Sequence, residues 1–360
     1  MTDDTNSLID FVTAVSGETY LKVEEDLGDG FVRLRISEAE RRQAKHDIRS
    51  FEDVVVELLR NARDAHAQRI FVASTREGDI RTMTVIDDGV GIPAGLHERV
   101  FEPRVTSKLE SMVVDRWGVH GRGMALFSVR SSVVSASIAA SDAHKGTAVV
   151  VVSDPIHLTE RADQSSWPVV ERDEAGALTV TRGPHNVVRR TLEFACEHPG
   201  IDVYLGSPAE ILATLHGVAR SEFDPTGLLF CDDPERLAVW QRPAASSDAA
   251  DLVDIARAIG LAVSERTAHR VLAGELVPLD TVVHQVLSDD EPEPVTAQPD
   301  IYRDRRGLHI HHTDLGQFKR DLTRAFDSLS ERYYLHLRGE PKITIGRDGI
   351  RVRFDVDKEE

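Results

Sequence analysis

The sequence predicts an α+β fold, with helices packed on a sheet, over roughly the first 155 residues. Apolar residues recur at helical spacing across 51–67, which indicates an amphipathic helix. Short apolar runs at 70–74, 82–86 and 148–152 are typical of strands. Helical and strand patterns that alternate in this way predict a layered α/β sandwich around one core.

The other elements of this segment follow in order. A helix is predicted over 124–134, and 138–140 is expected to form a strand that pairs with 148–152 after a turn. Asp154-Pro155 closes the last apolar strand, so we expect the first domain to end there.

The composition is that of a soluble globular protein. Of 360 residues, 41% are hydrophobic and 29% are charged, which suits two or three domains. No apolar run approaches the roughly 20 residues of a membrane span. The acidic start, MTDDTNSLIDF, lacks the order of a secretion signal. Because Cys196 and Cys231 are the only cysteines, we expect a reducing, cytoplasmic setting without disulfides.

The charge balance argues against non-specific binding to nucleic acid. Sixty-one acidic residues against 43 basic ones give a formal net charge of −18. Affinity for a polyanion depends on neutralising its phosphates, which an acidic chain does poorly. A local basic strip, or a protein partner that itself holds DNA, remains compatible with this balance.

The first group of candidate site residues lies on the helix pattern, in the run E-L-L-R-N-A-R-D-A. Glu57 and Asn61 are four residues apart and therefore share one face, with Asp64 near it a further turn on. An acid and an amide stacked in this way can hold a water molecule and a hydrated Mg²⁺, whose ligands are oxygens. The alternative is a solvent-facing polar stripe.

The second group follows the strand at 82–86. Asp87 ends the strand, and Gly89 and Gly91 let the backbone turn tightly and approach a ligand closely. A buried aspartate at a strand end can accept a hydrogen bond from an adenine amino group. The alternative is a plain turn, since Asp-Gly is a common turn dipeptide.

A glycine-rich segment then precedes the helix at 124–134. Its free backbone N–H groups and the helix N-terminus face one spot, which is a ready anion site for phosphates. No G-K-[ST] follows, so this is not a Walker loop. Gly146-Thr147 begins the last strand, where a threonine can reach the edge of a purine. The glycines of the segment are Gly118, Gly121 and Gly123.

In this order and spacing, the four motifs resemble the GHKL ATPase superfamily. That group includes type II topoisomerase ATPase subunits, mismatch-repair ATPases, the heat-shock chaperone of that fold and histidine kinases. The resemblance implies a Bergerat-type α/β sandwich that binds ATP and Mg²⁺. It implies that Glu57 is the general base that activates water and that Asn61 is the Mg²⁺ ligand.

The resemblance also assigns the ends of the nucleotide. Asp87 would bind the adenine amino group, Gly91 would let the base sit close, and Thr147 would support the adenine end. The segment glycines would cradle the phosphates. The implied reaction is attack of an oriented water on the γ-phosphate, with charge stabilised by Mg²⁺ and backbone dipoles.

The segment between the Asp motif and the glycine loop, 95–117, is expected to be the ATP lid. Its Thr106-Ser107-Lys108 looks like the lid of mismatch-repair ATPases and of topoisomerase VI B subunits. Lys108 would contact the lid or the phosphates, or it is a solvated loop lysine. A histidine kinase is disfavoured, because His46 in RQAKHDIRSF lacks the H-E-x-x-x-P surroundings of a phosphoacceptor.

Two later stretches favour the topoisomerase VI B branch. Residues 186–205 resemble the helix, His-Pro and strand that follow the ATPase fold in those subunits. Residues 251–276 predict two helices around Gly260, with Ser264 as N-cap of the second, and look like their helix-two-turn-helix insert. Its main basic side chains are Arg266 and Arg270. Two-helix turns are common, so a structural role is favoured over DNA contact.

The C-terminal part departs from that branch. An acidic, proline-rich linker is expected at 288–300, followed by a strand at 307–312, a helix at 315–337 and a hairpin at 342–345 and 350–356. This is a compact α/β piece, shorter than a transducer domain. Lys342 is a γ-phosphate-sensor candidate by position only. A metal at His309, His311 and His312 is disfavoured, because no acidic or cysteine ligand lies at a known spacing.

These observations predict four segments: an ATP-binding domain at 1–155, a connecting and helix-two-turn-helix-like region at 156–287, the linker at 288–300, and a shortened transducer-like piece at 301–360. The expected function is an ATP clamp in which ATP orders the lid and closes a homodimer, acting on DNA or with a DNA-cleaving partner. The alternative is a non-hydrolysing protein that senses ATP and regulates a partner. No membrane association is expected.

Overall fold

The structure is a computed structural model of the chain. It describes residues 23–36, 38, 42, 47–107, 113–115, 118–120, 123–164, 166–172, 176–222, 233–288, 315, 318–326, 335–339, 341–346 and 349–358. The chain forms two compact units, Met1–Pro292 and Glu293–Glu360. Residues 1–155 and 156–287, which the sequence divides into two segments, both lie in the first unit.

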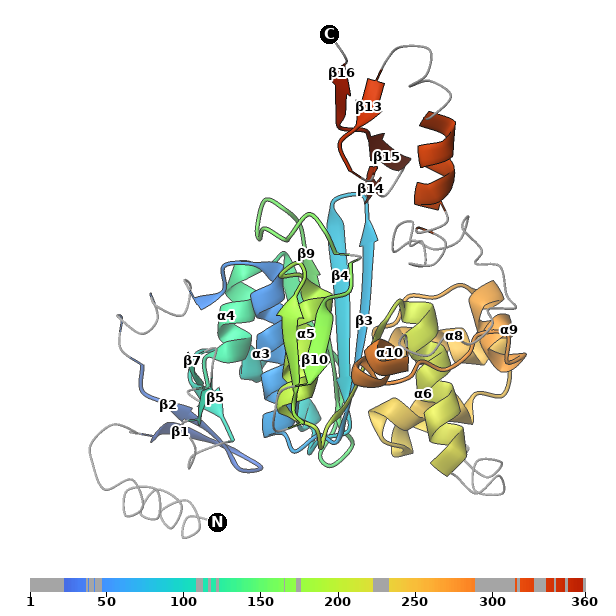
Figure 1. The fold of residues 1–360 in the computed structure, drawn as a ribbon. Helices are drawn as coiled ribbons and strands as arrows, with labels where there is room; N and C mark the ends of the chain where they lie inside the picture. Colours follow the sequence, from blue (N-terminus) through green and yellow to red (C-terminus); the bar gives the residue numbers. More distant parts are fainter. Residues whose placement is uncertain are drawn as a thin grey trace. The chain divides into compact units, whose positions relative to one another are not determined.

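A five-stranded sheet in the order β12-β3-β4-β9-β8 is the centre of the first unit (Figure 1). Strand β12 pairs parallel with β3, whereas the other neighbours are antiparallel. The sheet is therefore completed, at one edge, by a strand from beyond residue 155. The bounds are β3 Arg69–Glu77, β4 Ile80–Asp87, β8 Ser135–Ser141, β9 Thr147–Ser153 and β12 Asp202–Gly206.

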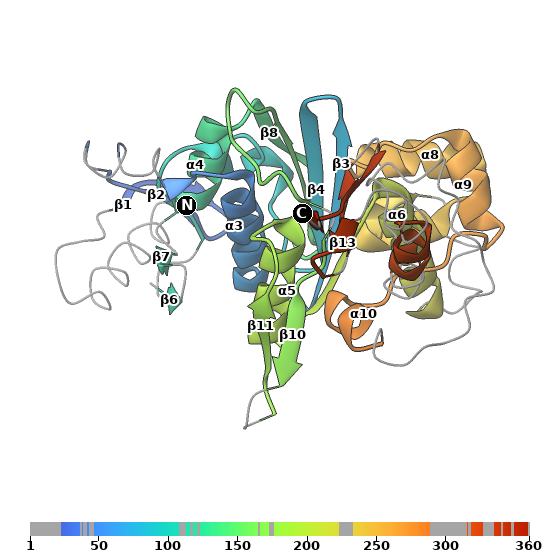
Figure 2. The ribbon, with the colours of Figure 1, turned by 45° about the horizontal axis from the view of Figure 1, so that its top comes forward.

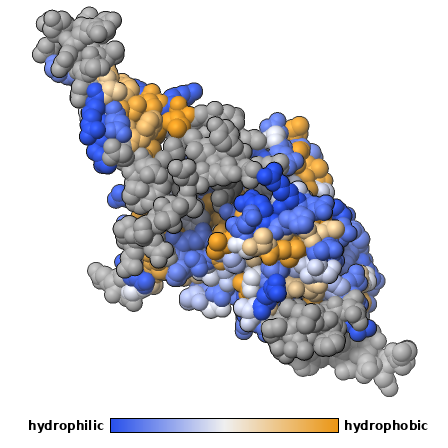
Figure 3. Space-filling model, turned by 90° about the vertical axis from the view of Figure 1, so that its right-hand side faces the viewer, coloured by the Kyte–Doolittle hydropathy of each residue, from blue (hydrophilic) through white to orange (hydrophobic). Residues whose placement is uncertain are grey.

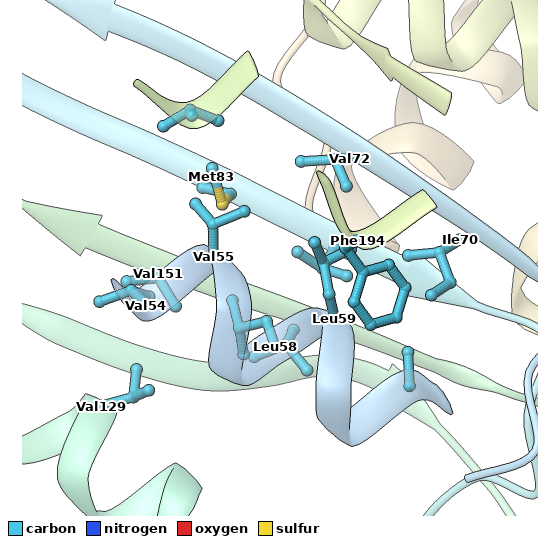
Figure 4. Packing of buried hydrophobic residues seen from close by; sticks show 14 of the residues in the cluster. Val54, Val55, Leu58, Leu59, Ile70, Val72, Met83, Val129, Val151 and Phe194 are labelled. Atoms are coloured by element: carbon cyan, nitrogen blue, oxygen red, sulfur yellow. The ribbon is translucent and has the colours of Figure 1, made fainter. Parts of the chain in front are cut away.

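Helices α3 (Phe51–Asp64), α4 (Ala125–Ser132) and α5 (Val187–Glu197) cover one face of the sheet. A capping box begins α3, because Ser50 and Asp53 satisfy each other's backbone N–H groups. The apolar stripe of α3 enters a shared core with strand residues such as Val72 and Met83 (Figure 4). The helix is thus fixed on its strands along most of its length.

The opposite face is covered by α6 (Pro208–Glu222), the 3-10 helix η4 (Val239–Ala245), α8 (Ala249–Ala258) and α9 (Glu265–Leu272). These elements bury a second core. In it the Phe71 ring stacks on Tyr204, with centroids 4.9 Å apart, and on Trp240 at 6.4 Å. The Arg69 guanidinium lies 4.8 Å from the Trp240 ring centroid. The sheet is therefore the middle of three layers.

The turn between α8 and α9 packs directly on this second face. Gly260 has φ +82°, and a Cβ there would lie 2.3 Å from Val150 Cγ2. The Thr84 hydroxyl donates to the Gly260 carbonyl at 2.7 Å. The expected N-cap is confirmed, because Ser264 accepts from the Thr267 N–H. The surface seen from the side of α8 and α9 is mostly hydrophilic with separate hydrophobic patches (Figure 3).

Smaller elements surround the layers. A three-stranded sheet joins β1 and β2 to β5, which lies in the middle of the expected lid. A two-stranded ribbon of β10 and β11 lies beside α5 (Figure 2). The bounds are β1 Val23–Gly28, β2 Phe31–Leu34, η1 Ala94–Leu96, η2 Arg99–Phe101, β5 Val105–Thr106, β6 Val113–Asp115, β7 Gly118–His120, β10 Val169–Arg172, β11 Leu178–Arg182, η3 Pro234–Arg236 and α10 Val282–Ser288.

The described part of the second unit contains helical residues 318–326 and two short antiparallel pairs, β13 (Leu335–Leu337) with β16 (Val356–Lys358) and β14 (Lys342–Gly346) with β15 (Gly349–Arg353). Phe326 stacks on Phe354 with centroids 4.9 Å apart. The expected helix 315–337 is too long, because its last three residues form β13. The expected strand 350–356 is divided between two strands, because β15 ends at Arg353 and β16 begins at Val356.

The elements of the first segment match their predictions within a few residues. The helix expected over 51–67 ends at Asp64, and that over 124–134 spans Ala125–Ser132. The strands are longer than predicted at both ends. None of the described helices is long and apolar enough to span a membrane. His46, the expected linker from 289 onward and the strand at 307–312 lie outside the described residues.

Candidate active site

Burial of one side of α3 determines which residues stand on its polar side. Val55 and Leu59 are completely buried against the sheet (Figure 4). Glu57, Asn61 and Asp64 lie at i, i+4 and i+7 and are half-buried. The helix therefore presents an acid, an amide and a second acid in a row.

Each acid of this row is held by an arginine of the same helix. Glu57 Oε1 accepts from Arg60 Nη1 at 2.7 Å, and the Arg60 side chain is only 4% exposed. Asp64 Oδ1 accepts from Arg63 Nε and Nη2, both at 3.0 Å. The orientation of both carboxylates is thus restrained before any ligand arrives.

Asn61 differs from its two acidic neighbours. Its amide nitrogen, Nδ2, is buried and has no hydrogen-bond partner within the described part of the chain. A buried donor without an acceptor costs roughly 1–3 kcal/mol, so natural proteins rarely leave one unless a ligand or water completes it. The amide of Asn61 is therefore where this face of the helix has unmet hydrogen-bonding capacity.

Arg63 also connects α3 to the end of α5. Its Nη1 lies 3.1 Å from His198 Nε2, and His198 Nδ1 lies 2.9 Å from the Phe194 carbonyl. A carbonyl only accepts, so Nδ1 carries the proton and Nε2 accepts from the arginine. The C-terminal ends of the two helices are joined through this histidine.

Asp87 and Thr147 lie opposite each other on adjacent strands, β4 and β9. Each is 5% exposed. Asp87 Oδ1 accepts from the Gly89 N–H at 2.9 Å, which fixes the carboxylate at the strand end. The two residues that the sequence assigns to the adenine end are therefore brought together by strand register.

Ser141, at the end of β8, ties this pair to its surroundings. Its hydroxyl donates to the Gly146 carbonyl at 2.8 Å and accepts from the Ile92 N–H at 2.7 Å. The Thr147 hydroxyl lies 3.1 Å from the same oxygen. Since Ser141 has only one proton to give, Thr147 is the donor in that contact and keeps its lone pairs for acceptance.

Close backbone packing explains two of the glycines. Gly91 has φ +73°, and a Cβ there would lie 1.9 Å from the Asp142 carbonyl oxygen. Gly146 has φ +76°, and a Cβ there would lie 2.1 Å from the Asp87 carbonyl oxygen. Only glycine fits such contacts at positive φ. Gly89 is also confined, since a Cβ there would approach the Ala65 oxygen to 2.6 Å.

The phosphate end is described in part. Gly118 lies in β7, paired with Asp115 of β6. Gly123 has φ +66°, and its carbonyl accepts from the Arg104 N–H at 2.8 Å, beside β5 in the middle of the expected lid. Lys108 and Gly121 lie outside the described residues.

Charges also surround the loop between β8 and β9. The Lys145 ammonium, 3.1 Å from Asp142, and then the Ala143 N–H hold the pKa of Asp142 below its ordinary value. Arg242 of η4 is buried, and this burial lowers its pKa, while Glu235 and Asp142 oppose the shift. The charges of this loop therefore act on a charged residue of the outer helical layer.

The described residues offer few ligands for a metal of their own. No three His, Cys, Asp or Glu side chains among them gather into a candidate metal site. Mg²⁺ bound with a nucleotide needs only one or two protein oxygens, because phosphates and water supply the rest. The amide oxygen of Asn61, beside its unpartnered nitrogen, fits that requirement. The three histidines at 309, 311 and 312 lie outside the described residues.

Some polar contacts at this site could not be found from the sequence. Arg60 and Arg63 follow from their spacing on a helix, but their choice of partner depends on side-chain conformation. Ser141 gave no signal, because a serine at a strand end is ordinary. The contact with His198 required knowing that α5 packs against α3.

The segment that carries this geometry has known relatives. Residues 46–156 match the family described as histidine kinase-, DNA gyrase B-, and HSP90-like ATPase. They are therefore a GHKL-type ATPase domain, and the matched segment includes both the α3 row and the Asp87–Thr147 pair.

A known relative is similar to part of the chain. The DNA mismatch repair protein MutL of Thermus aquaticus is 40% identical over 84 residues. The alignment covers 23% of this chain and 15% of the length of that protein. The similarity therefore covers less than a quarter of this chain and leaves most of both proteins uncompared.

Proposed function

We propose that this protein binds ATP in the site between α3 and the Asp87–Thr147 pair. The observation that carries the proposal is the pairing of those two residues across β4 and β9, where tight packing at Gly91 and Gly146 excludes side chains. A carboxylate and a hydroxyl oxygen are both acceptors, which matches the two N–H donors of the adenine amino group.

The same proposal assigns the other end of the nucleotide. Asn61 would hold Mg²⁺ through its amide oxygen, with Asp64 beside it, and the metal would neutralise charge on the phosphates. Gly89 and Gly91 lie in the same turn, against which the adenine base would pack. The phosphates would lie against backbone N–H groups of the glycine loop and near Lys108. The loop glycines are Gly118, Gly121 and Gly123.

We propose further that the protein hydrolyses ATP. Glu57 stands one helical turn before Asn61, so a water held by its carboxylate would lie near a phosphate bound at Asn61. Such a carboxylate can accept the proton of the water as it attacks the γ-phosphate. Its fixed orientation supports this role, since a general base must be held in place.

A clamp that closes as a homodimer on ATP is the form of activity that we favour. Strand β5, in the middle of the expected lid, pairs with β2, and the Gly123 carbonyl accepts from the Arg104 N–H, so the lid, the N-terminal strands and the glycine loop are joined. Order in the lid set by γ-phosphate contacts would provide two states. The helix α5, the His198-Pro199 pair and β12 support a topoisomerase VI B-like role beside a DNA-cleaving partner. A direct contact with DNA is no part of the proposal.

The test is ATP turnover and molecular mass for the native chain and for Glu57→Ala, each with and without a non-hydrolysable ATP analogue. We expect Glu57→Ala to bind ATP and to lose turnover by a factor on the order of 10²–10⁴, the usual contribution of a general base. We expect the analogue to double the mass.

Other outcomes change the proposal in defined ways. Binding without turnover or change in mass would replace the clamp by an ATP sensor that regulates a partner. Turnover that Glu57→Ala leaves intact would remove Glu57 from the mechanism. No ATP binding at all would end the proposal.

A further inference from the structure

Arg60 is a buried charged residue on α3, next to the candidate Mg²⁺ ligand Asn61, that the proposed mechanism has not used. Its side chain is 4% exposed, although arginine is rarely buried unless it is paired. Its neighbours Leu58 and Leu59 belong to the apolar core, so packing alone would be served better by an apolar residue. Its burial therefore calls for an explanation in terms of a partner.

Glu57 is one such partner. The Arg60 Nη1 lies 2.7 Å from Glu57 Oε1, one turn away on the same helix. The Glu57 side chain is 19% exposed, so the contact is largely shielded from water, where a charged hydrogen bond is stronger and more directional than on the surface. One carboxylate oxygen thus has its position set by the protein.

A general base gains from such restraint. A free glutamate side chain samples several rotamers, and each wrong one moves the carboxylate away from the attacking water. The contrast with Asn61 is informative, because its amide nitrogen has no partner among the described residues and awaits one. The base is fixed by the chain itself, whereas the Mg²⁺ candidate is left for the ligand to complete.

We propose that Arg60 is a positioning residue that holds the Glu57 carboxylate for attack of water on ATP. This inference rests on the proposed hydrolysis and names a residue that it did not contain. Arg60 acts through Glu57 and touches no reacting atom, so removing it changes the rate of the chemical step and leaves binding of ATP unchanged.

The test measures kcat and KM for ATP in the native chain, Arg60→Gln, Arg60→Lys, Glu57→Gln and the double variant. We expect Arg60→Gln to lower kcat by about ten- to a hundredfold, the cost of a misplaced group, with KM within about twofold. Arg60→Lys keeps the charge, so its kcat should lie between that of the native chain and that of Arg60→Gln. In the Glu57→Gln background, Arg60→Gln should change the residual rate by less than about twofold, because its target is gone.

A matched control comes from α5. Arg189 Nε donates to Glu193 at 2.8 Å, and the two side chains are 12% and 8% exposed, against 4% and 19% for Arg60 and Glu57. Arg189→Gln removes a similar arginine–glutamate pair from the same helical layer, outside the site. Its thermal melting temperature should fall as that of Arg60→Gln does, while kcat stays native.

The possible results separate the two proposals. A native chain that binds ATP without turnover overturns hydrolysis and this inference together. If the native chain turns ATP over and Arg60→Gln leaves kcat unchanged or raises it, this inference alone is overturned. It is also overturned if Arg60→Gln lowers the rate as much in the Glu57→Gln background as in the native chain. Should Arg60→Gln not fold, Arg60→Lys decides: a native kcat overturns the inference, and a reduced kcat with native KM supports it.

Discussion

The two faces of the central sheet are covered by different kinds of side chains. On the α3 face, an apolar core lies under a row of polar groups that stay half-buried, among them Glu57 and Asn61. The outer face is filled with aromatic and aliphatic side chains, including Phe71 and Trp240, with closely fitted contacts at the Gly260 turn. The first face carries the candidate site residues, whereas the second is closely packed.

The two faces meet at the loop between β8 and β9. On its inner side the loop packs against Gly91 and the strand end at Asp87. On its outer side the Lys145 carbonyl accepts from the Val239 N–H at 2.7 Å, and the Lys145 ammonium donates to the Glu235 carbonyl at 3.0 Å. The proposed adenine end is therefore braced by a layer that lies outside the GHKL-type segment.

The largest effect should come from Gly91→Ala, on the site face. The new Cβ would meet the Asp142 carbonyl oxygen at 1.9 Å in a backbone with φ +73°, so the turn beside Asp87 must move. We expect ATP affinity to fall by at least about a hundredfold, since a shift there misplaces the groups that receive the base. Isothermal titration calorimetry measures the ATP affinity of the variant and of the native chain.

The control for this variant is Gly200→Ala. A Cβ at Gly200 would have no heavy atom within 4 Å, the backbone there has no positive φ, and the residue follows α5 and belongs to none of the site motifs. The ATP affinity of this variant should be native. Native affinity in Gly91→Ala would show that the turn tolerates the methyl group and would weaken the placement of the base.

A second prediction concerns the outer face. Gly260→Ala places a Cβ 2.3 Å from Val150 Cγ2 at φ +82°. Overpacking and left-handed backbone together should lower the free energy of unfolding by about 2–4 kcal/mol. ATP affinity should stay within about twofold of native, because the strain falls on the side of the sheet away from α3. Chemical denaturation and calorimetry measure the two quantities.

Gly274→Ala separates the two causes. Gly274 also has positive φ, at +69°, but no heavy atom lies within 4 Å of a Cβ there. It should therefore lose only the backbone part, about 1–2 kcal/mol. Equal losses in the two variants would mean that the Gly260 contact with the sheet contributes nothing.

The difference between the faces also explains what could be predicted from sequence. The α3 helix, the strands β3, β4 and β9, and the order of the site motifs follow from local periodicity and spacing. The pairing of Asp87 with Thr147 depends only on register between neighbouring strands. These features belong to the site face or to the sheet itself.

The outer layer could not be assigned in the same way. The continuous apolar runs at 70–73 and 148–152 do signal a sheet covered on both faces. They do not indicate which later segment of the chain covers the second face of the sheet. Nor does spacing reveal that Arg60 turns toward Glu57, because several partners lie within reach of an arginine side chain. Such facts depend on tertiary packing.

The smallest expected effect is a pH dependence that belongs to the outer layer. His216 of α6 is 8% exposed. Its burial, and then the Arg220 charge, lower its pKa below the ordinary value of 6.5. The folded protein therefore binds this proton less readily than the unfolded chain, so its contribution to stability is fully present above about pH 6.5 and is lost as pH falls toward the lowered pKa.

His216→Gln removes this titration. The free energy of unfolding of the native chain should decline between pH 7.5 and 5.5 by more than that of the variant, and His269→Gln, changed at an exposed position of α9, should behave as native. ATP affinity at pH 7.5 should not change, since His216 belongs to α6, which covers the face of the sheet opposite α3. Parallel pH profiles for native and His216→Gln would mean that this histidine accepts its proton equally well folded and unfolded. Its burial would then not restrain protonation, and the outer layer would be more open to water than its packing indicates.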